Sequence, residues 1–434
     1  MLGGRDPLAA VDGVSFHVDP GETLAIVGES GSGKSLTAKA IMGLLPAPHV
    51  RVASGEILFD GEDLVKVDYE RLRQLRGSEI SMIFQEPMTA LNPVMTIGSQ
   101  IDEIFRFHAS MSSVERREKA VELLNDVNLP DPAQIVNAYA HELSGGQRQR
   151  AMIAMALALN PKILIADEPT TALDVTTQAQ ILNLIKEMQS LHNTGVLFIT
   201  HDFGVVADIA DRVAVMQEGT IVEAGPVKEV LNKPTHQYTK SLIKAVPSLT
   251  PRPPRRKSDD GVIEVKKLNK TFGSEKSFFG FGKSQRVVKA VQNVSIDLFQ
   301  GETLGIVGES GSGKSTLARC IIRLMDFESG DVLLHGNNIS KIGRAEMRPF
   351  RTKIQMVFQD PFASLNPRIK VGNIISQGPI VQGQPRDLAE TRARDLLSIV
   401  GLDDRAFDRY PHEFSGGQRQ RIGIARALAL EPEV

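Results

Sequence analysis

Cysteine is almost absent from this sequence of 434 residues, because Cys320 is the only one. A single cysteine excludes a disulfide framework and excludes metal or iron–sulfur sites built from several thiolates. It is typical of a protein kept in a reducing cytosol. An excess of charge of one sign is also missing: the net charge is −2 at pH 7, which gives no electrostatic indication of nucleic-acid binding.

Long apolar segments are missing as well. The longest apolar run, Ala151–Leu159, is far shorter than the roughly 20 residues that a bilayer span requires, so we expect that the chain does not cross a membrane itself. The first ten residues show no basic start followed by an apolar core. We therefore expect no secretion signal.

The sequence does contain a domain-sized repeat. Its length suits two domains, and its 41% hydrophobic and 24% charged residues are typical of globular proteins. The stretch "GETLAIVGESGSGKS" at Gly21–Ser35 recurs at Gly301–Ser315 with one difference, Ala25 against Gly305. Two more pairs follow in the same order: Met82–Pro93 with Met356–Pro367, and His141–Arg150 with His412–Arg421.

The repeat predicts two domains joined by a linker. We place the first domain at 1–246, a proline-rich linker at 247–261 and the second domain at 262–434. Apolar runs such as Ile163–Pro169 and Gly195–Asp202 predict buried strands, and the segments between them have helical spacing. This alternation indicates an α/β fold with a mostly parallel sheet and crossover helices.

The two copies differ at their ends. The second copy aligns with the first only as far as Ile163, and the first copy has no counterpart of Val262–Phe272. We interpret this as a fragment or a misassigned gene. The missing strands should leave an open apolar edge beside the second P-loop, so we expect the second copy to be poorly stable alone.

Both repeats contain the pattern G-x-x-x-x-G-K-[ST] after a strand and before a helix, which predicts a P-loop. Its glycines let consecutive backbone N–H groups face one concavity that a triphosphate fills. Lys34 and Lys314 would reach the phosphates, and Ser35 and Ser315 would ligate Mg²⁺. The nucleotide contacts predicted from the two loops are Gly28, Glu29, Ser30, Gly31, Ser32, Gly33, Lys34, Ser35, Gly308, Glu309, Ser310, Gly311, Ser312, Gly313, Lys314 and Ser315.

A P-loop needs a carboxylate at the end of a neighbouring strand to hold hydrated Mg²⁺. Asp167 follows four apolar residues and provides it, and Glu168 is placed to orient or deprotonate the attacking water. His201, at the end of the next strand, is a candidate to sense the terminal phosphate. The second copy has no counterpart of these three residues, so we expect its site not to hydrolyse ATP.

Taken together, the P-loop, the glutamine of "FQEP", "LSGGQ", "ILIADEP", "ALD" and the strand-end histidine resemble the nucleotide-binding domain of ABC transporters over nearly the whole chain. The resemblance implies tandem P-loop NTPase domains, each with a helical signature subdomain. It implies that Gln85 and Gln359 contact the Mg²⁺ and water, and that Asp174 communicates across a dimer of the two domains. The signature residues that it assigns to ATP are Ser144, Gly145, Gly146, Gln147, Ser415, Gly416, Gly417 and Gln418.

In this family two domains sandwich two ATP molecules head to tail. The resemblance therefore pairs the Lys34 loop with Ser415–Gln418 and the Lys314 loop with Ser144–Gln147. It also assigns adenine stacking to Phe272, whereas Phe16 of the first copy aligns with Ile296 and is expected in the core. We therefore expect weakened ATP affinity at the first site.

The subfamily can be narrowed to the oligopeptide, dipeptide and nickel importer ATPases, which Met82–Pro93 and Lys233–Leu249 resemble. Two fused domains are similar to the glutathione and microcin-type peptide importer ATPases. The implied partners are membrane permease subunits, with Glu86–Pro93 as the expected contact, and indirectly a solute-binding protein. The implied location is the cytoplasmic face of the membrane. A non-hydrolysing remnant and a soluble two-domain translation factor remain alternatives.

Overall fold

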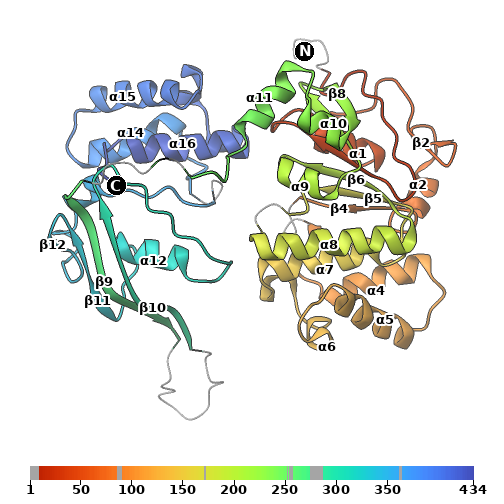
Figure 1. Cartoon of the computed structure of the whole chain (residues 1–434), viewed down its shortest axis with the longest axis horizontal. Helices are drawn as coiled ribbons and strands as arrows, with labels where there is room; N and C mark the ends of the chain where they lie inside the picture. Colours follow the sequence, from red (N-terminus) through yellow and green to blue (C-terminus); the bar gives the residue numbers. More distant parts are fainter. Residues whose placement is uncertain are drawn as a thin grey trace. The chain divides into compact units, whose positions relative to one another are not determined.

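The computed structural model describes residues 9–85, 90–170, 173–251, 253, 258–273, 287–360 and 364–434. The chain divides into two units, Met1–Pro251 and Arg252–Val434, and each is described here by itself (Figure 1). The division falls inside the segment 247–261 that the sequence indicates as a linker. Among the helices of the described residues, none is both long enough and apolar enough to cross a bilayer.

Unit 1 is built on a six-stranded sheet with the order β4-β5-β6-β1-β7-β8. All neighbouring pairs are parallel except β7 and β8, which are antiparallel. The mostly parallel sheet expected from the sequence is therefore present. The strands of this sheet are β1 (Thr23–Val27), β4 (Ile80–Ile83), β5 (Ile163–Asp167), β6 (Gly195–Thr200), β7 (Arg212–Gln217) and β8 (Thr220–Pro226).

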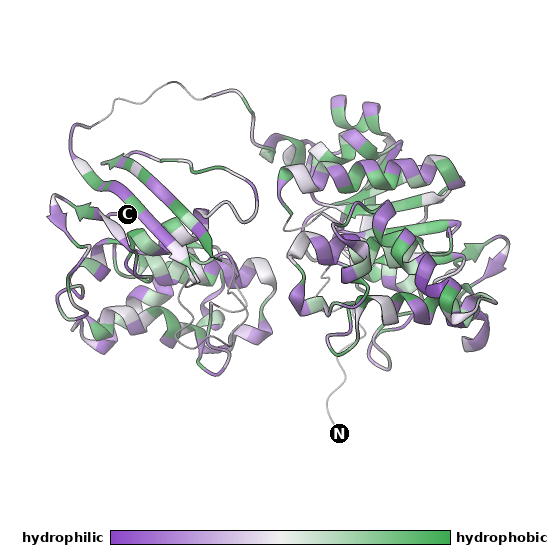
Figure 2. Ribbon diagram, turned by 90° about the horizontal axis from the view of Figure 1, so that it is seen from below, coloured by the Kyte–Doolittle hydropathy of each residue, from purple (hydrophilic) through white to green (hydrophobic). Residues whose placement is uncertain are grey.

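Both faces of this sheet are covered by helices, which is why its strands are apolar throughout rather than alternating (Figure 2). In β1, Leu24 and Ile26 pack in one core cluster with residues of α1, while Ala25 and Val27 pack on the opposite face with residues of α9 to α11. The helices of unit 1 are α1 (Lys34–Ile41), α2 (Tyr69–Leu75), α4 (Ile97–His108), α5 (Ser113–Asp126), α6 (Pro132–Ile135), α7 (Gly145–Leu157), α8 (Val175–His192), α9 (Phe203–Ile209), α10 (Val227–Asn232), α11 (Gln237–Ala245) and the 3₁₀ helix η1 (Ala140–Glu142).

Unit 2 contains a different sheet. Its four strands have the order β10-β9-β11-β12 and all pair antiparallel. They are β9 (Gly261–Phe272), β10 (Val288–Phe299), β11 (Ser329–Leu334) and β12 (Asn337–Asn338). The helices of unit 2 are α12 (Lys314–Ile321), α13 (Phe350–Lys353), α14 (Val371–Val381), α15 (Arg386–Ile399), α16 (Gly416–Leu428) and the 3₁₀ helices η2 (Asp404–Asp408) and η3 (Pro411–Glu413).

The two units therefore differ in their sheets: unit 1 has a mostly parallel sheet, and unit 2 has an antiparallel sheet. In unit 2, β9 is a central strand that pairs with both β10 and β11. Among the described residues of unit 1 no strand takes this place, and outside the six-stranded sheet the named strands that pair are β2 (Leu58–Phe59) and β3 (Glu62–Asp63), which form a short antiparallel ribbon. A sheet without its central strand cannot form the hydrogen bonds that hold the outer strands.

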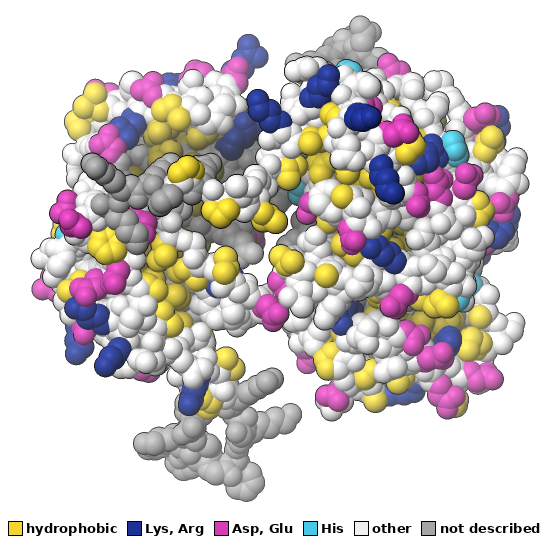
Figure 3. Space-filling model, viewed as in Figure 1, with side chains coloured by type: hydrophobic (Ala, Val, Ile, Leu, Met, Phe, Trp, Pro, Cys, Tyr) yellow, Lys and Arg dark blue, Asp and Glu magenta, His cyan; other side chains and the backbone are white. Residues whose placement is uncertain are grey.

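The described segment before the second P-loop lacks the parallel strand that precedes the first P-loop. Residues 303–307 repeat the sequence of β1 but form no strand in the described part of unit 2. Leu304, Ile306 and Val307 are 42%, 44% and 92% exposed, whereas β1 is buried between β6 and β7. Hydrophobic side chains are visible on the surface of unit 2 in Figure 3. These side chains leave apolar surface uncovered beside the second P-loop, but the segment forms no strand, so the expected open sheet edge itself is not present in the described residues.

Candidate functional site

The candidate site lies at the edge of the unit 1 sheet where the parallel strands end. The carboxyl ends of β1, β4, β5 and β6 share this edge because these strands are parallel. A crevice at the carboxyl ends of parallel strands is the usual ligand site of an α/β sheet. The sheet thus brings together the P-loop after β1, Gln85 after β4, Asp167 at the end of β5 and His201 after β6.

The P-loop has the backbone that its glycines predict. Gly28 has a φ of 156°, and a Cβ atom there would lie 2.1 Å from the carbonyl oxygen of Met216. Gly33 has a φ of 102° and precedes α1. The loop therefore lies directly against β7, and it leads into the N-terminus of α1, where backbone N–H groups and the helix dipole favour an anion.

Lys34 is 5% exposed, and its side chain folds back over the loop. Its Nζ donates hydrogen bonds to the carbonyl oxygens of Gly28 and Glu29, each at 2.8 Å, and to Oγ of Ser32 at 3.3 Å. Burial lowers the pKa of Lys34, and the carboxylates of Glu168 and Asp167 oppose this shift. The ammonium group is thus held in the loop by carbonyl groups and faces two carboxylates.

Ser35 and Asp167 form a pair of oxygen ligands. Oγ of Ser35 donates to Oδ1 of Asp167 at 3.0 Å, and the Asp167 side chain is 3% exposed. Burial raises the pKa of Asp167, while the Ser35 hydrogen bond acts in the opposite direction. A hydroxyl and a buried carboxylate side by side suit a hard cation such as Mg²⁺, which prefers oxygen ligands and would offset the burial of the charge.

Glu168 lies at the centre of three predicted residues. Its Oε2 accepts a hydrogen bond from Nε2 of Gln85 at 2.8 Å, and its Oε1 lies 3.3 Å from Nδ1 of His201. The backbone of Glu168 is left-handed, with a φ of 48°. The three side chains come from three different strand ends, so the sheet topology rather than local sequence assembles them.

The contact with Glu168 raises the pKa of His201, although burial acts in the opposite direction. The ion pair therefore contributes stability that is present below the ordinary value of about 6.5 and is lost as the pH rises through the raised pKa. We expect the His201 ring to titrate above 6.5 in the wild type and closer to 6.5 in Glu168→Gln. An NMR titration of the ring protons checks this, and equal midpoints in the two proteins would contradict it.

The two signature stretches have the same local geometry. Ser144 caps α7: its Oγ accepts from the backbone N–H of Gln147 at 3.3 Å, and its own N–H donates to Oε1 of Gln147 at 2.9 Å. Ser415 and Gln418 make the same reciprocal pair at 3.4 and 3.0 Å before α16. Asp174 likewise caps α8. Ser144, Ser415 and Asp174 therefore act as helix N-caps. The contact of either signature with a nucleotide stays a prediction.

The second P-loop has the shape of the first. Nζ of Lys314 donates to the carbonyl oxygens of Gly308 and Glu309 at 2.6 and 2.7 Å and to Oγ of Ser312 at 3.3 Å. Ser315 and Gln359 are exposed in unit 2. No strand beside this loop carries a counterpart of Asp167 within the described residues. The loop thus has the phosphate-binding elements of the first site without its acidic ones.

The aromatic residues discussed for adenine stacking lie in different environments. Phe272, at the end of β9, is 40% exposed, with Nζ of Lys270 5.4 Å from its ring centroid. Phe16 is partly buried against the core cluster that contains Leu24 and Ile26, as expected. The stacking function of Phe272 stays a prediction. Of the expected permease contact, residues 86–89 lie outside the described part of the chain.

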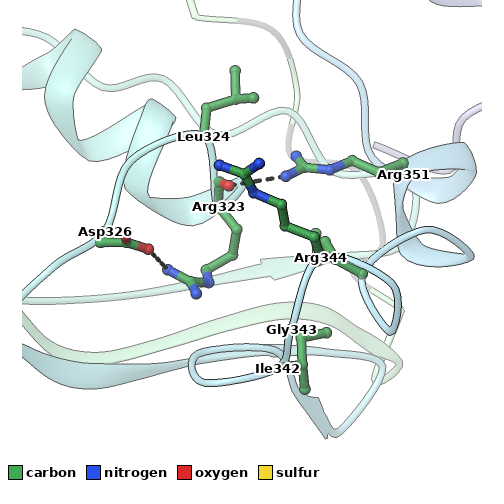
Figure 4. A pocket seen from close by; sticks show the side chains of 8 residues that line it. Arg323, Leu324, Asp326, Ile342, Gly343, Arg344 and Arg351 are labelled. Carbon is green, nitrogen blue, oxygen red and sulfur yellow. Dashed lines mark hydrogen bonds and ion pairs between the residues drawn. The ribbon is translucent and has the colours of Figure 1, made fainter.

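A pocket of about 430 Å³ in unit 2 holds none of these residues (Figure 4). It lies at the C-terminal end of α12, where Arg351 donates hydrogen bonds to the carbonyl oxygens of Ile322 and Arg323. In unit 1, Arg76 makes the equivalent bonds to the carbonyl oxygens of Met42 and Gly43. The repeat of this contact indicates that the arginine stabilises a helix end.

The sequence did not predict two hydrogen bonds between the backbone of the first P-loop and other parts of unit 1. The phenolic oxygen of Tyr238, in α11, accepts a hydrogen bond from the backbone N–H of Glu29 at 3.1 Å. The N–H of Gly219, in the turn between β7 and β8, donates to the carbonyl oxygen of Ser32 at 3.0 Å. The only sequence signal was the importer-like stretch Lys233–Leu249, which does not reveal a contact across 209 positions.

Comparison with known proteins identifies the family of the chain. Residues 11–171 and 291–434 match the family described as ABC transporter, and residues 222–273 match the oligopeptide/dipeptide transporter C-terminal region. The chain is 50% identical over 428 residues to the peptidoglycan transport ATP-binding protein YejF of Agrobacterium fabrum, covering 98% of this chain and 77% of the relative.

It is 48% identical over 454 residues to the glutathione import ATP-binding protein GsiA of Salmonella paratyphi A, covering 98% and 73% of the two chains. Among solved structures, the ATP-binding cassette MJ0796 bound to ADP and Pi matches at 32% identity and a TM-score of 0.47, covering 52% of this chain and 94% of that one. The chain thus belongs to the ABC transporter family of ATPases and carries two segments of its nucleotide-binding domain.

Proposed function

We propose that the protein is the ATP-hydrolysing subunit of an importer that takes up peptides or similar small solutes through a separate membrane permease. The observation that carries this proposal is the cluster of Lys34, Ser35, Asp167 and Glu168 at one sheet edge. The match of residues 222–273 to the oligopeptide/dipeptide transporter region supports the cargo class, as do the names of the two relatives.

Each side chain has a task that its geometry suits. Lys34 binds the terminal phosphates, for which it exchanges part of its contacts with the loop carbonyls. Ser35 and Asp167 would hold Mg²⁺, which would neutralise phosphate charge. Glu168 orients the attacking water and accepts its proton, and Gln85 and His201 fix the Glu168 carboxylate from two sides.

The remaining predictions concern partners. We propose that permease subunits bind near Glu86–Pro93, that a solute-binding protein delivers the cargo and that the protein works at the cytoplasmic face of the membrane. The second P-loop would bind ATP through its backbone and Lys314, and the described residues of unit 2 place no counterpart of Asp167 or Glu168 beside it. Co-purification with a permease distinguishes this proposal from a soluble translation factor, which would not retain one.

Replacing Lys34 with alanine is expected to abolish ATP turnover and weaken ATP binding about 100-fold, because Lys34 is the only Lys or Arg within the loop Gly28–Ser35. The measurement is nucleotide titration of the purified chain together with steady-state ATPase activity. Lys66→Ala, at an exposed position after β3, is the control and should behave as wild type. Wild-type turnover in Lys34→Ala would remove the basis of the proposal.

A further inference from the structure

The described contacts connect the C-terminal part of unit 1 to the P-loop through one peptide group. The N–H of Glu29 donates to the phenolic oxygen of Tyr238 at 3.1 Å. The carbonyl of the same peptide unit belongs to Gly28 and accepts from Nζ of Lys34 at 2.8 Å. A trans peptide is planar, with its N–H and C=O pointing in opposite directions. A side chain that holds this N–H therefore also fixes the direction of the carbonyl that holds Lys34.

Tyr238 is itself firmly placed. It packs with Leu242 and Ile243 of α11 against a core cluster that contains Val27 of β1. The turn before α11 is tied to Glu223 of β8, whose carboxylate accepts the N–H groups of Thr235 and His236 at 2.7 and 3.1 Å. Although burial opposes the shift, these hydrogen bonds lower the pKa of Glu223 to about 2, so the carboxylate stays charged at neutral pH.

Comparison of the two P-loops separates the effect of Tyr238 from that of the loop sequence. Gly308, Gly311 and Gly313 have φ angles of 155°, 83° and 95°, against 156°, 88° and 102° for Gly28, Gly31 and Gly33. The segment 222–246 that surrounds Tyr238 belongs to unit 1, and the second loop reaches the same shape. The octapeptide and its glycines are thus sufficient for the loop conformation. We therefore expect Tyr238 to stabilise this conformation and not to be required for its formation.

We propose that Tyr238 is a positioning residue of the ATP site: it fixes the Gly28–Glu29 peptide, and through its carbonyl the Lys34 ammonium, so that the C-terminal segment 222–246 sets nucleotide affinity. This inference rests on ATP binding at the Lys34 loop, as proposed above. Tyr238 contacts the backbone of Glu29, and the segment supports the loop through this contact. A displacement of α11 would then change the position of the Lys34 ammonium group.

Tyr238→Phe in the full chain tests this, because it removes only the phenolic oxygen. We expect KM for ATP to rise about three- to tenfold, the range of one hydrogen bond, with kcat nearly unchanged. The control is Tyr69→Phe, at a tyrosine that is 67% exposed and lies outside the P-loop contacts. A variant that is merely less stable would lose kcat through its inactive fraction and keep KM.

Hydrogen–deuterium exchange supplies a readout that is independent of turnover. In Tyr238→Phe the amides of a fragment covering 21–36 should exchange faster, because the Glu29 N–H has lost its acceptor. The fragment covering 301–316 is the internal control, and the two differ in mass through Ala25 against Gly305 and Leu36 against Thr316. Its exchange should not change.

The outcomes are distinguishable. A raised KM with retained kcat and faster exchange in 21–36 alone supports the inference. An unchanged KM, or a fall in kcat at constant KM, overturns it while leaving the proposed function intact. If the wild-type chain binds no ATP, the proposed function fails and the inference fails with it.

Discussion

Replacing Glu168 with glutamine is expected to lower kcat for ATP hydrolysis by at least about 100-fold while ATP binding is retained. Glutamine keeps the size of the side chain and one oxygen but cannot accept the proton of the attacking water, and general-base catalysis contributes about 10²–10⁴-fold. Lys34, which we propose binds the phosphates, is unchanged in this variant. Parallel measurement of ATPase activity and of nucleotide affinity therefore separates the catalytic function of Glu168 from binding.

The matched control is Glu187→Gln, at an exposed position of α8 away from the site. It removes the same charge and should retain wild-type turnover. If wild-type activity is measurable and Glu168→Gln retains it, Glu168 is not the base. If the wild type itself binds ATP but turns none over, the alternative of a non-hydrolysing ATP-binding protein is correct and the importer motor is not.

The second large effect is a difference in amide exchange between two nearly identical segments of one chain. Residues 23–27 form a central strand, hydrogen-bonded on both sides and buried. Residues 303–307 form no strand in the described part of unit 2, and their apolar side chains are exposed. Because a central strand opens only with a large part of its domain, we expect the first segment to exchange at least about 1000 times more slowly.

Hydrogen–deuterium exchange with mass spectrometry on the intact chain measures both segments in one experiment. The sequence match acts as the control, since intrinsic exchange rates depend on local sequence and the segments differ only at Ala25 and Gly305. Comparable protection of the two segments would show that residues 303–307 are paired and buried in solution. The same exposure predicts preferential proteolysis near Val307, which is 92% exposed.

The sequence predicted much of unit 1 and of its site. The strands ending at Val27, Asp167 and Thr200 were recognisable as short apolar runs, and the motifs that follow them gave the candidate site residues, whose functions stay predictions. The meeting of Gln85, Glu168 and His201 could not be worked out from spacing, because their strand ends lie far apart in the chain. The structure shows the contacts and supplies the reason, namely that parallel strands end at one edge.

By itself the sequence determined the conformation of both P-loops. The three glycines of each loop take nearly the same φ angles in two different surroundings, because glycine positions and the lysine-to-carbonyl hydrogen bonds act within the loop. Only the tertiary structure decided whether the preceding residues become a strand. The segment before Gly28 is a buried strand and that before Gly308 is not, because a strand needs partners that donate and accept its hydrogen bonds. The contact of Tyr238 with Glu29 could not be predicted from the sequence either, because it depends on the packing of α11, which brings the two residues together.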